Sequence, residues 1–121
     1  MESVNFDIQN LPRDYRIWLF TGYTDLRKSV DGLSDIAQYD FRIDTSSSIM
    51  LFCGRRVDRI KVLYRINGNY GLLYYRYESE SLSWPRADGE AWELSYDQMA
   101  DLLNGRPLNR KNISNIITSD R

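Results

Sequence analysis

One stretch decides the fold, residues 59–76, which reads RIKVLYRINGNYGLLYYR. In its first half, aliphatic or aromatic residues alternate with mostly basic ones, the pattern of a strand with one buried face. Asn67-Gly68 follows, and it suits a type I′ turn because both central positions of that turn need positive φ. Residues 70–78 then return as the antiparallel partner. The sequence therefore predicts a β-hairpin of two long strands.

The length of the turn decides which side chains share a face of this hairpin. A two-residue loop pairs Ile66 with Asn69 and Arg59 with Arg76. One face then carries basic and aromatic side chains, namely Arg59, Lys61, Arg65, Tyr70, Tyr74 and Arg76. A three-residue loop with a bulge would instead place Tyr75 and Tyr77 beside the basic residues. Cations and tyrosines are interleaved in both arrangements.

Two shorter segments before the hairpin, 16–21 and 49–53, are expected to be strands because they are apolar and rich in β-branched or aromatic residues. Between them we expect an amphipathic helix, 24–38, with Thr24 as its N-cap. Its apolar face recurs at helical spacing and consists of Leu26, Val30, Leu33 and Ala37. This face is suited to packing on a sheet.

After the hairpin, residues 81–85 and 91–94 are expected to form two short strands around a turn at Asp88-Gly89. Ser95 and Gln98 make a capping box that opens a second helix, 96–104. The predicted fold class is α+β: a single domain with a mainly antiparallel sheet of about five or six strands and two helices.

The chain of 121 residues is the size of one domain. Residues 1–14 lack periodicity and are interpreted as a flexible N-terminal arm, 15–105 as the domain, and 106–121 as a polar C-terminal tail. No apolar run approaches the roughly 20 residues of a membrane span, and the N-terminus lacks the pattern of a secretory signal. We expect a cytoplasmic protein that does not contact the membrane.

The chain has no histidine and a single cysteine, Cys53, which lies in an apolar stretch. We expect Cys53 to be a buried packing residue, because a reactive thiol needs a neighbouring base. The lack of histidine removes most zinc, haem and nucleophile chemistry, and no glycine-rich phosphate loop is present. The composition therefore favours a protein that is not an enzyme and uses no metal or cofactor.

Charge is segregated along the chain, although the net charge is only −1. Residues 50–77 carry six positive and one negative side chain, whereas 78–101 carry one positive and seven negative. If the acidic block covered the basic one, the two would neutralise each other through ion pairs worth at most about 1 kcal/mol each. On separate faces, the basic block would attract phosphate or an acidic partner. The sequence leaves both arrangements open.

The basic, tyrosine-rich hairpin is the strongest candidate for a binding surface. Such ribbons lie in DNA grooves or against phosphates, and aromatic faces stack on exposed bases. The competing interpretation is an ordinary exposed sheet face that the acidic block covers. Trp84 beside Arg86 is a second candidate, because Trp and Arg are frequent anchors of protein interfaces. Trp84 could equally pack its own segment onto the sheet.

Several stretches, in chain order, resemble a known family. They are 21–33 (TGYTDLRKSVDGL), Leu51-Phe52 with Arg55-Arg56, Asp58-Arg59-Ile60-Lys61, Leu63-Tyr64 and Trp84-Pro85-Arg86. Together they are similar to the TnpB-type small accessory protein of the insertion-sequence sixty-six family of bacterial transposable elements. The resemblance extends over about residues 16–105. It implies a protein encoded beside a separate transposase, needed for efficient transposition and without an established enzymatic activity.

The resulting hypothesis is a non-catalytic accessory factor for DNA transposition that binds element DNA, the transposase or both. Its candidate contact residues are Arg27, Lys28, Arg55, Arg56, Arg59, Lys61, Arg65, Tyr74, Arg76, Trp84 and Arg86. The alternative is a protein–protein adaptor that uses Trp84, Arg86 and the acidic block without touching DNA. An exposed edge strand would allow a dimer.

Overall fold

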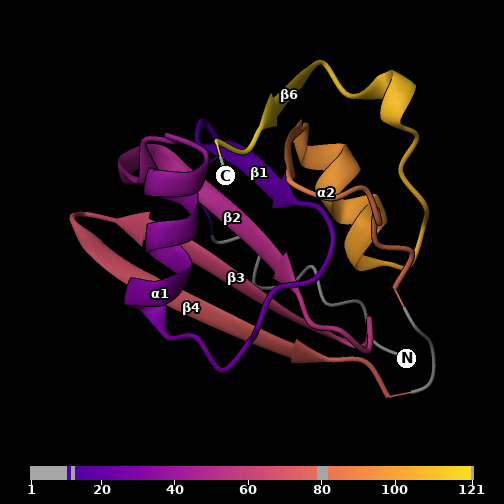
Figure 1. The fold of residues 1–121 in the computed structure, drawn as a ribbon, viewed down its shortest axis with the longest axis horizontal. Coiled ribbons are helices and arrows are strands. Elements are labelled where there is room, and N and C mark those ends of the chain that lie inside the picture. The colour runs from indigo at the N-terminus through magenta and orange to yellow at the C-terminus, as the bar shows by residue number, and fades with distance from the viewer. Residues whose placement is uncertain (1–10, 12, 79–81, 121) are drawn as a thin grey trace.

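A computed structural model describes residues 11, 13–78 and 82–120. Six strands form one sheet in the order β4-β3-β2-β1-β5-β6 (Figure 1). They are β1 (Arg16–Phe20), β2 (Ser48–Cys53), β3 (Arg59–Ile66), β4 (Asn69–Arg76), β5 (Glu90–Leu94) and β6 (Asn115–Thr118). Only β1 and β2 are parallel, and the other neighbours are antiparallel. The predicted α+β fold with a mainly antiparallel sheet is confirmed.

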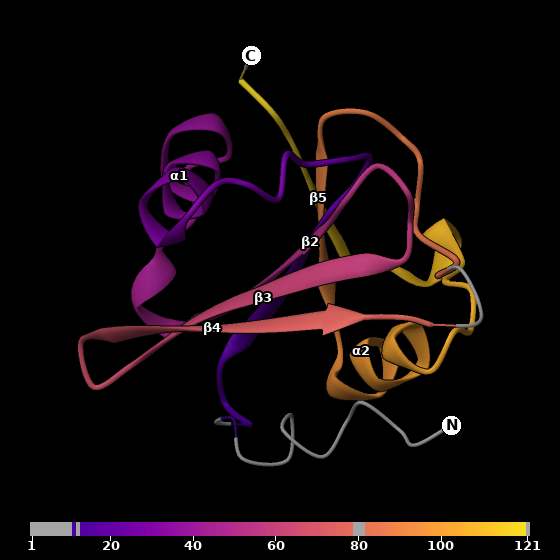
Figure 2. The ribbon, with the colours of Figure 1, turned by 90° about the horizontal axis from the view of Figure 1, so that it is seen from below.

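Helices cover both faces of the sheet. The first, α1 (Val30–Asp35), continues as the π-helical segment η3 (Ile36–Asp40), and α2 (Tyr96–Leu103) follows β5. Figure 2 shows α1 and α2 on opposite sides of the strands. Among the described residues, none of the helices is long and apolar enough to cross a membrane. Short 3₁₀ turns, η4 (Thr45–Ser47) and η5 (Arg110–Asn112), precede β2 and β6.

The core has two halves because side chains alternate across the strands. Leu19 and Leu51 pack with the α2 side, whereas Trp18 and Phe52 pack with the α1 side. Every residue of β2 is buried, as its continuous apolar run suggests for a central strand. Cys53 ends this strand in the core, and burial raises the pKa of its thiol to about 12. The predicted packing role of Cys53 is confirmed.

The hairpin has the two-residue turn. Asn67 and Gly68 adopt φ of 53° and 79°, as a type I′ turn requires. Arg59 lies opposite Arg76 and Ile66 opposite Asn69, so the register derived for this loop is confirmed. The capping box of α2 is confirmed too, since the Ser95 hydroxyl accepts from the Gln98 amide and the Gln98 side chain accepts from the Ser95 amide.

The first helix begins later than predicted, so Thr24 is not its N-cap. It starts at Val30, after Ser29. The preceding loop is held open by other bonds: the Thr24 amide donates to the Cys53 carbonyl at 2.8 Å, and the Arg27 amide donates to Asp25 Oδ1 at 3.0 Å. An aspartate that binds the backbone two residues ahead competes with helix formation.

The strand predicted at 81–85 is wrong. Residue 81 lies outside the described residues, 82–87 form no strand, and β5 pairs with β1 and β6 instead. The Trp84 indole donates to the Phe20 carbonyl at 3.1 Å, and the Gly22 amide donates to the Pro85 carbonyl at 2.9 Å. These bonds lay the segment across the end of β1. Pro85 itself has no amide to offer a sheet.

The C-terminal segment contributes the sixth strand of the sheet. In β6, Ile117 lies opposite Ala91, so the segment expected as a tail, 106–121, contains an edge strand. Its apolar content is only Ile116 and Ile117, too short a run to reveal a strand. Most of the predicted N-terminal arm lies outside the described residues, but Leu11 is buried in the core on the α2 side.

Candidate functional site

Three of the four basic residues of the hairpin, Arg59, Lys61 and Arg76, gather at its open end, far from the Asn67-Gly68 turn. Arg59 and Arg76 form the last cross-strand pair, and Lys61 pairs with Tyr74. These side chains share the sheet face that carries α1, but α1 covers the middle and the turn-proximal part of that face, where Leu63, Leu72 and Tyr70 are packed. The open end therefore stays accessible, and Tyr74 is 53% exposed.

Two loops bring further cations to this position. The loop before α1 supplies Arg27 and Lys28, and the turn between β2 and β3 supplies Arg55 and Arg56. The loop is tied to β3 because Lys61 Nζ donates to the Lys28 carbonyl at 3.1 Å. We call this surface the basic end, and it consists of Arg27, Lys28, Arg55, Arg56, Arg59, Lys61, Tyr74 and Arg76.

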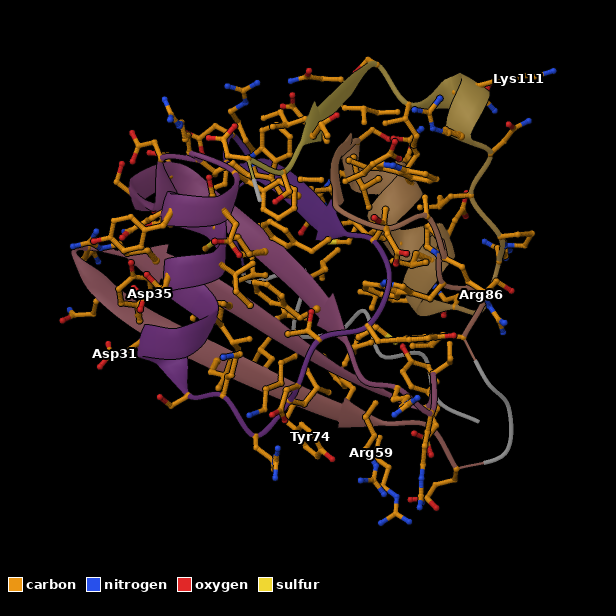
Figure 3. The ribbon with its side chains drawn as sticks, in the orientation of Figure 1. Asp31, Asp35, Arg59, Tyr74, Arg86 and Lys111 are labelled. Carbon is orange, nitrogen blue, oxygen red and sulfur yellow. The ribbon has the colours of Figure 1, made fainter. Side chains whose placement is uncertain are left out.

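The centre of the basic end is a shallow hollow of about 350 Å³. Arg27, Arg55, Arg56, Arg59 and Tyr74 line it together with Thr24, Asp25, Leu26, Gly54 and Asp58. Figure 3 shows Arg59 and Tyr74 extending along the same lower edge of the molecule, below the start of α1. The hollow thus joins three segments that are separated in the sequence.

Val57 shapes the turn that carries two of these arginines. It adopts φ of 60°, a left-handed conformation that costs a β-branched residue about 1–3 kcal/mol. Hydrogen bonds hold it there: its amide donates to the Gly54 carbonyl at 3.1 Å, and its carbonyl accepts from Leu82 at 2.8 Å. The turn leaves Arg55 and Arg56 exposed at its tip. Maintained strain of this kind is typical of functional sites.

Positive charge dominates the basic end. Arg59 and Arg76 face each other directly across the strands, an arrangement that is unfavourable for like charges. The hollow itself is lined by four arginines, Arg27, Arg55, Arg56 and Arg59, and by two acids, Asp25 and Asp58. The Arg27 side chain holds Asp25 with a hydrogen bond of 2.9 Å and lowers the pKa of that carboxyl to about 2. Asp58 Oδ1 lies 3.7 Å from Arg59 Nε, beyond hydrogen-bonding distance.

The acidic block, 78–101, forms its ion pairs away from the basic end. Its ion pairs within the described ranges are with arginines outside the hairpin: Glu93 with Arg16 at 2.8 Å, Glu90 with Arg110 at 3.0 Å, and Asp101 with Arg106 at 2.8 Å. Hydrogen bonds from these arginines lower the pKa values of Glu90 and Glu93. Across residues 13–78 and 82–120, no acid of the block pairs with the basic end. The acidic block therefore does not neutralise the basic end through ion pairs, although its first residue, Glu78, follows Arg76 closely in the sequence.

Three predicted contact residues do not join the basic end. Trp84 is only 4% exposed and packs in the core, so its side chain is unavailable as an interface anchor. Arg86 is exposed, but Figure 3 shows it well away from Arg59 and Tyr74. Arg65 lies near the hairpin turn, with its guanidinium carbon 5.0 Å from the centre of the Tyr70 ring.

The sequence interpretation missed Tyr23. This side chain is 46% exposed and lines a second hollow, of about 500 Å³, together with Thr24, Asp25, Arg27 and Arg55. The signal was present in the sequence, because Tyr23 directly precedes the loop that carries Arg27.

Among the described residues, no group of three His, Cys, Asp or Glu side chains is placed to hold a metal ion. The basic end instead offers guanidinium and ammonium donors around an aromatic ring. Those groups suit phosphate oxygens and flat aromatic ligands.

The family model of the IS66 Orf2-like proteins, TnpB_IS66, matches residues 15–113. The chain belongs to this family. The predicted family is thereby confirmed, and membership gives the IS66 Orf2-like chain a transposition-associated accessory role. It is also similar to the "uncharacterized protein y4hO" of Sinorhizobium fredii (strain NBRC 101917 / NGR234), with 28% identity over 94 residues, which is 77% of this chain and 82% of that protein. No solved structure matches the chain.

Proposed function

We propose that this IS66 Orf2-like protein supports transposition by holding DNA of the element through its basic end, in concert with the transposase. The observation that carries the proposal is the convergence of four arginines from three segments on one hollow with two acids, while the acidic block pairs with other arginines. Among the described residues, no ion pair from the acidic block neutralises the basic end.

Phosphate groups are the ligand that this chemistry fits best. Arginine presents forked N–H donors that match phosphate oxygens, and neutralised phosphates release counterions, which strengthens binding at low salt. Contacts of this kind position a protein on DNA without selecting a sequence. We therefore expect sequence-independent binding, as an accessory factor at a transposition complex would need.

The C-terminal third is the less suitable surface for a partner. Trp84, the anchor of the adaptor hypothesis, is in the core, and three acids of the block are engaged by arginines of the same chain. A partner docking there would have to displace existing ion pairs. In the basic end, Arg27 is paired with Asp25 and Arg59 lies 3.7 Å from Asp58, while Arg55, Arg56, Lys61 and Arg76 form no ion pair among the described residues.

The proposal is tested by titrating labelled duplex DNA with the protein at several salt concentrations and following fluorescence anisotropy. We expect log K to fall linearly with log salt, with a slope of about −0.9 for each phosphate contacted. Replacing Arg59 and Arg76 with glutamine should make the slope shallower by about 2.

A matched control comes from two exposed arginines that already have acidic partners. The double variant Arg106→Gln, Arg110→Gln removes the same charge from the C-terminal third and should leave the slope unchanged. Failure to bind duplex at about 50 mM salt, or equal effects of both double variants, would contradict the proposal.

A further inference from the structure

Exposed aromatic side chains lie at the basic end as well as cations. Three large apolar side chains are exposed among the described residues: Tyr23, Tyr39 and Tyr74. Tyr74 lines the hollow of about 350 Å³, and Tyr23 lines the one of about 500 Å³. The two hollows share Thr24, Asp25, Arg27 and Arg55, so they adjoin. Tyr39 lines neither of them.

A surface for duplex phosphates alone has no need of such rings. In a duplex the bases are stacked on each other and present only their edges, so a tyrosine cannot stack on them. Unpaired bases expose their flat faces, and proteins that bind single strands combine aromatic platforms with a cationic groove. The basic end has both components, since cations lie between and beside the two exposed tyrosines.

Arg27 lies where the two hollows meet, and its orientation is set in advance. Its Nε donates to Asp25 Oδ1 at 3.0 Å and its terminal nitrogen donates to Asp25 Oδ2 at 2.9 Å, although the side chain is 92% exposed. The bidentate contact orients the guanidinium plane and leaves its other N–H groups free for phosphate or for stacking. A long side chain is thereby ordered before any ligand binds.

We propose that the basic end binds a single-stranded stretch of DNA, with one base stacked on Tyr74, another on Tyr23, and the phosphates between them on Arg27 and Arg55. This inference rests on the proposed function and narrows its ligand from DNA in general to DNA with unpaired bases. Such strands form wherever a duplex is opened or frayed at an end.

The test compares a labelled single strand with a duplex of the same length at the same salt concentration, again by anisotropy. We expect the wild type to bind the single strand more tightly. Tyr74→Leu and Tyr23→Leu should each weaken single-strand binding by about fivefold to a hundredfold and change duplex binding by less than about twofold. Tyr74→Phe should bind like the wild type because stacking uses the ring and not the hydroxyl.

Tyr39→Leu is the matched control, because it removes a third exposed tyrosine, outside both hollows, and should change neither affinity. Thermal unfolding checks that each exposed substitution leaves the fold intact. Equal binding of both DNA forms, with no effect of Tyr74→Leu, would overturn the inference, while a shallower salt slope in the Arg59, Arg76 variant would still support the proposed function. The absence of binding to either form would overturn both.

Discussion

The basic end and the C-terminal third use charge in opposite ways. In the C-terminal third, Glu90 and Glu93 are bound by Arg110 and Arg16, so opposite charges come together and join β5 to neighbouring segments. In the basic end, cations from three segments come together and Arg59 faces Arg76. A fold gains nothing from placing like charges opposite one another. Under the function proposed above, charge in one region serves the fold and in the other serves a ligand.

The largest expected effect concerns Trp84, in the segment that connects the two regions. Trp84→Ala should destabilise the protein by about 3–5 kcal/mol, because it leaves a cavity in the core and an unpaired Phe20 carbonyl. Urea unfolding measures this loss. The exposed neighbour Arg86→Ala should change stability by less than about 0.5 kcal/mol. If Trp84→Ala were stable but lost a binding partner, Trp84 would belong to an interface after all.

A smaller effect is expected at Tyr77, which follows β4 and links the basic end to α2. Its hydroxyl donates to the Leu103 carbonyl at 2.8 Å, so Tyr77→Phe should cost about 1 kcal/mol in unfolding free energy. Burial raises the pKa of Tyr77. The stabilisation is therefore complete below the ordinary tyrosine pKa of about 10 and decreases as the pH rises above it.

Cys53 also favours unfolding in alkali, because burial raises the pKa of its thiol to about 12. The contribution of Tyr77 is separated from that of Cys53 by comparing the wild type with Tyr77→Phe across the pH range. Wild type and Tyr77→Phe share Cys53, so the difference between their stability curves isolates Tyr77. That difference should shrink above about pH 10. Parallel curves throughout would mean that Tyr77 ionises as easily in the folded protein as in the unfolded chain.

A still smaller effect is expected for the ion pairs of the C-terminal third. Glu93→Gln should cost at most about 1 kcal/mol at neutral pH, because Arg16 is largely exposed. The Arg16 hydrogen bond lowers the pKa of Glu93, so this stabilisation is present above the ordinary glutamate pKa of about 4.3 and is lost as the pH falls below it. Unfolding at a series of pH values checks this. Glu78→Gln, an exposed acid without an ion pair among the described residues, is the control.

The smallest effect on stability is expected in the basic end. Arg59→Gln should change the unfolding free energy by about 0.5 kcal/mol or less, in the stabilising direction, because it relieves repulsion from Arg76. Thermal or urea unfolding measures the change. A clear loss of stability would show that Arg59 serves the fold, and the contrast between the two regions would fail.

Local signals explain which parts of the fold could be predicted. The hairpin followed from Asn67-Gly68, with its register left open between two loop lengths, and the start of α2 followed from the Ser95 capping box, because each depends on neighbouring residues alone. The start of α1 could not be predicted from helical spacing, since Asp25 binds the Arg27 backbone and Thr24 binds β2. The strand β6 was missed because its stability comes from pairing with β5.

The candidate site, like the fold, could be predicted where it depends on neighbouring residues and not where it depends on tertiary contacts. The cations of the hairpin were predicted as one face, but their meeting with Arg27 and Arg55 depends on the packing of two loops against the end of β3. Trp84 was a candidate anchor because it lies beside Arg86, with packing onto the sheet as the equal alternative, and its tertiary bond to Phe20 and its burial in the core decide for packing. Tyr23 was missed because it lies between the first predicted strand and the predicted helix 24–38, where no pattern indicated its exposure.

The central claim, that the basic end is the DNA-binding surface, is tested most directly by two-dimensional ¹H–¹⁵N NMR spectra recorded during a DNA titration. The amide signals that shift should come from residues 23–28, 54–61 and 74–76, and those of β5 and β6 should stay in place. Shifts concentrated in β5, β6 and α2, with none around Arg59 and Tyr74, would contradict the claim.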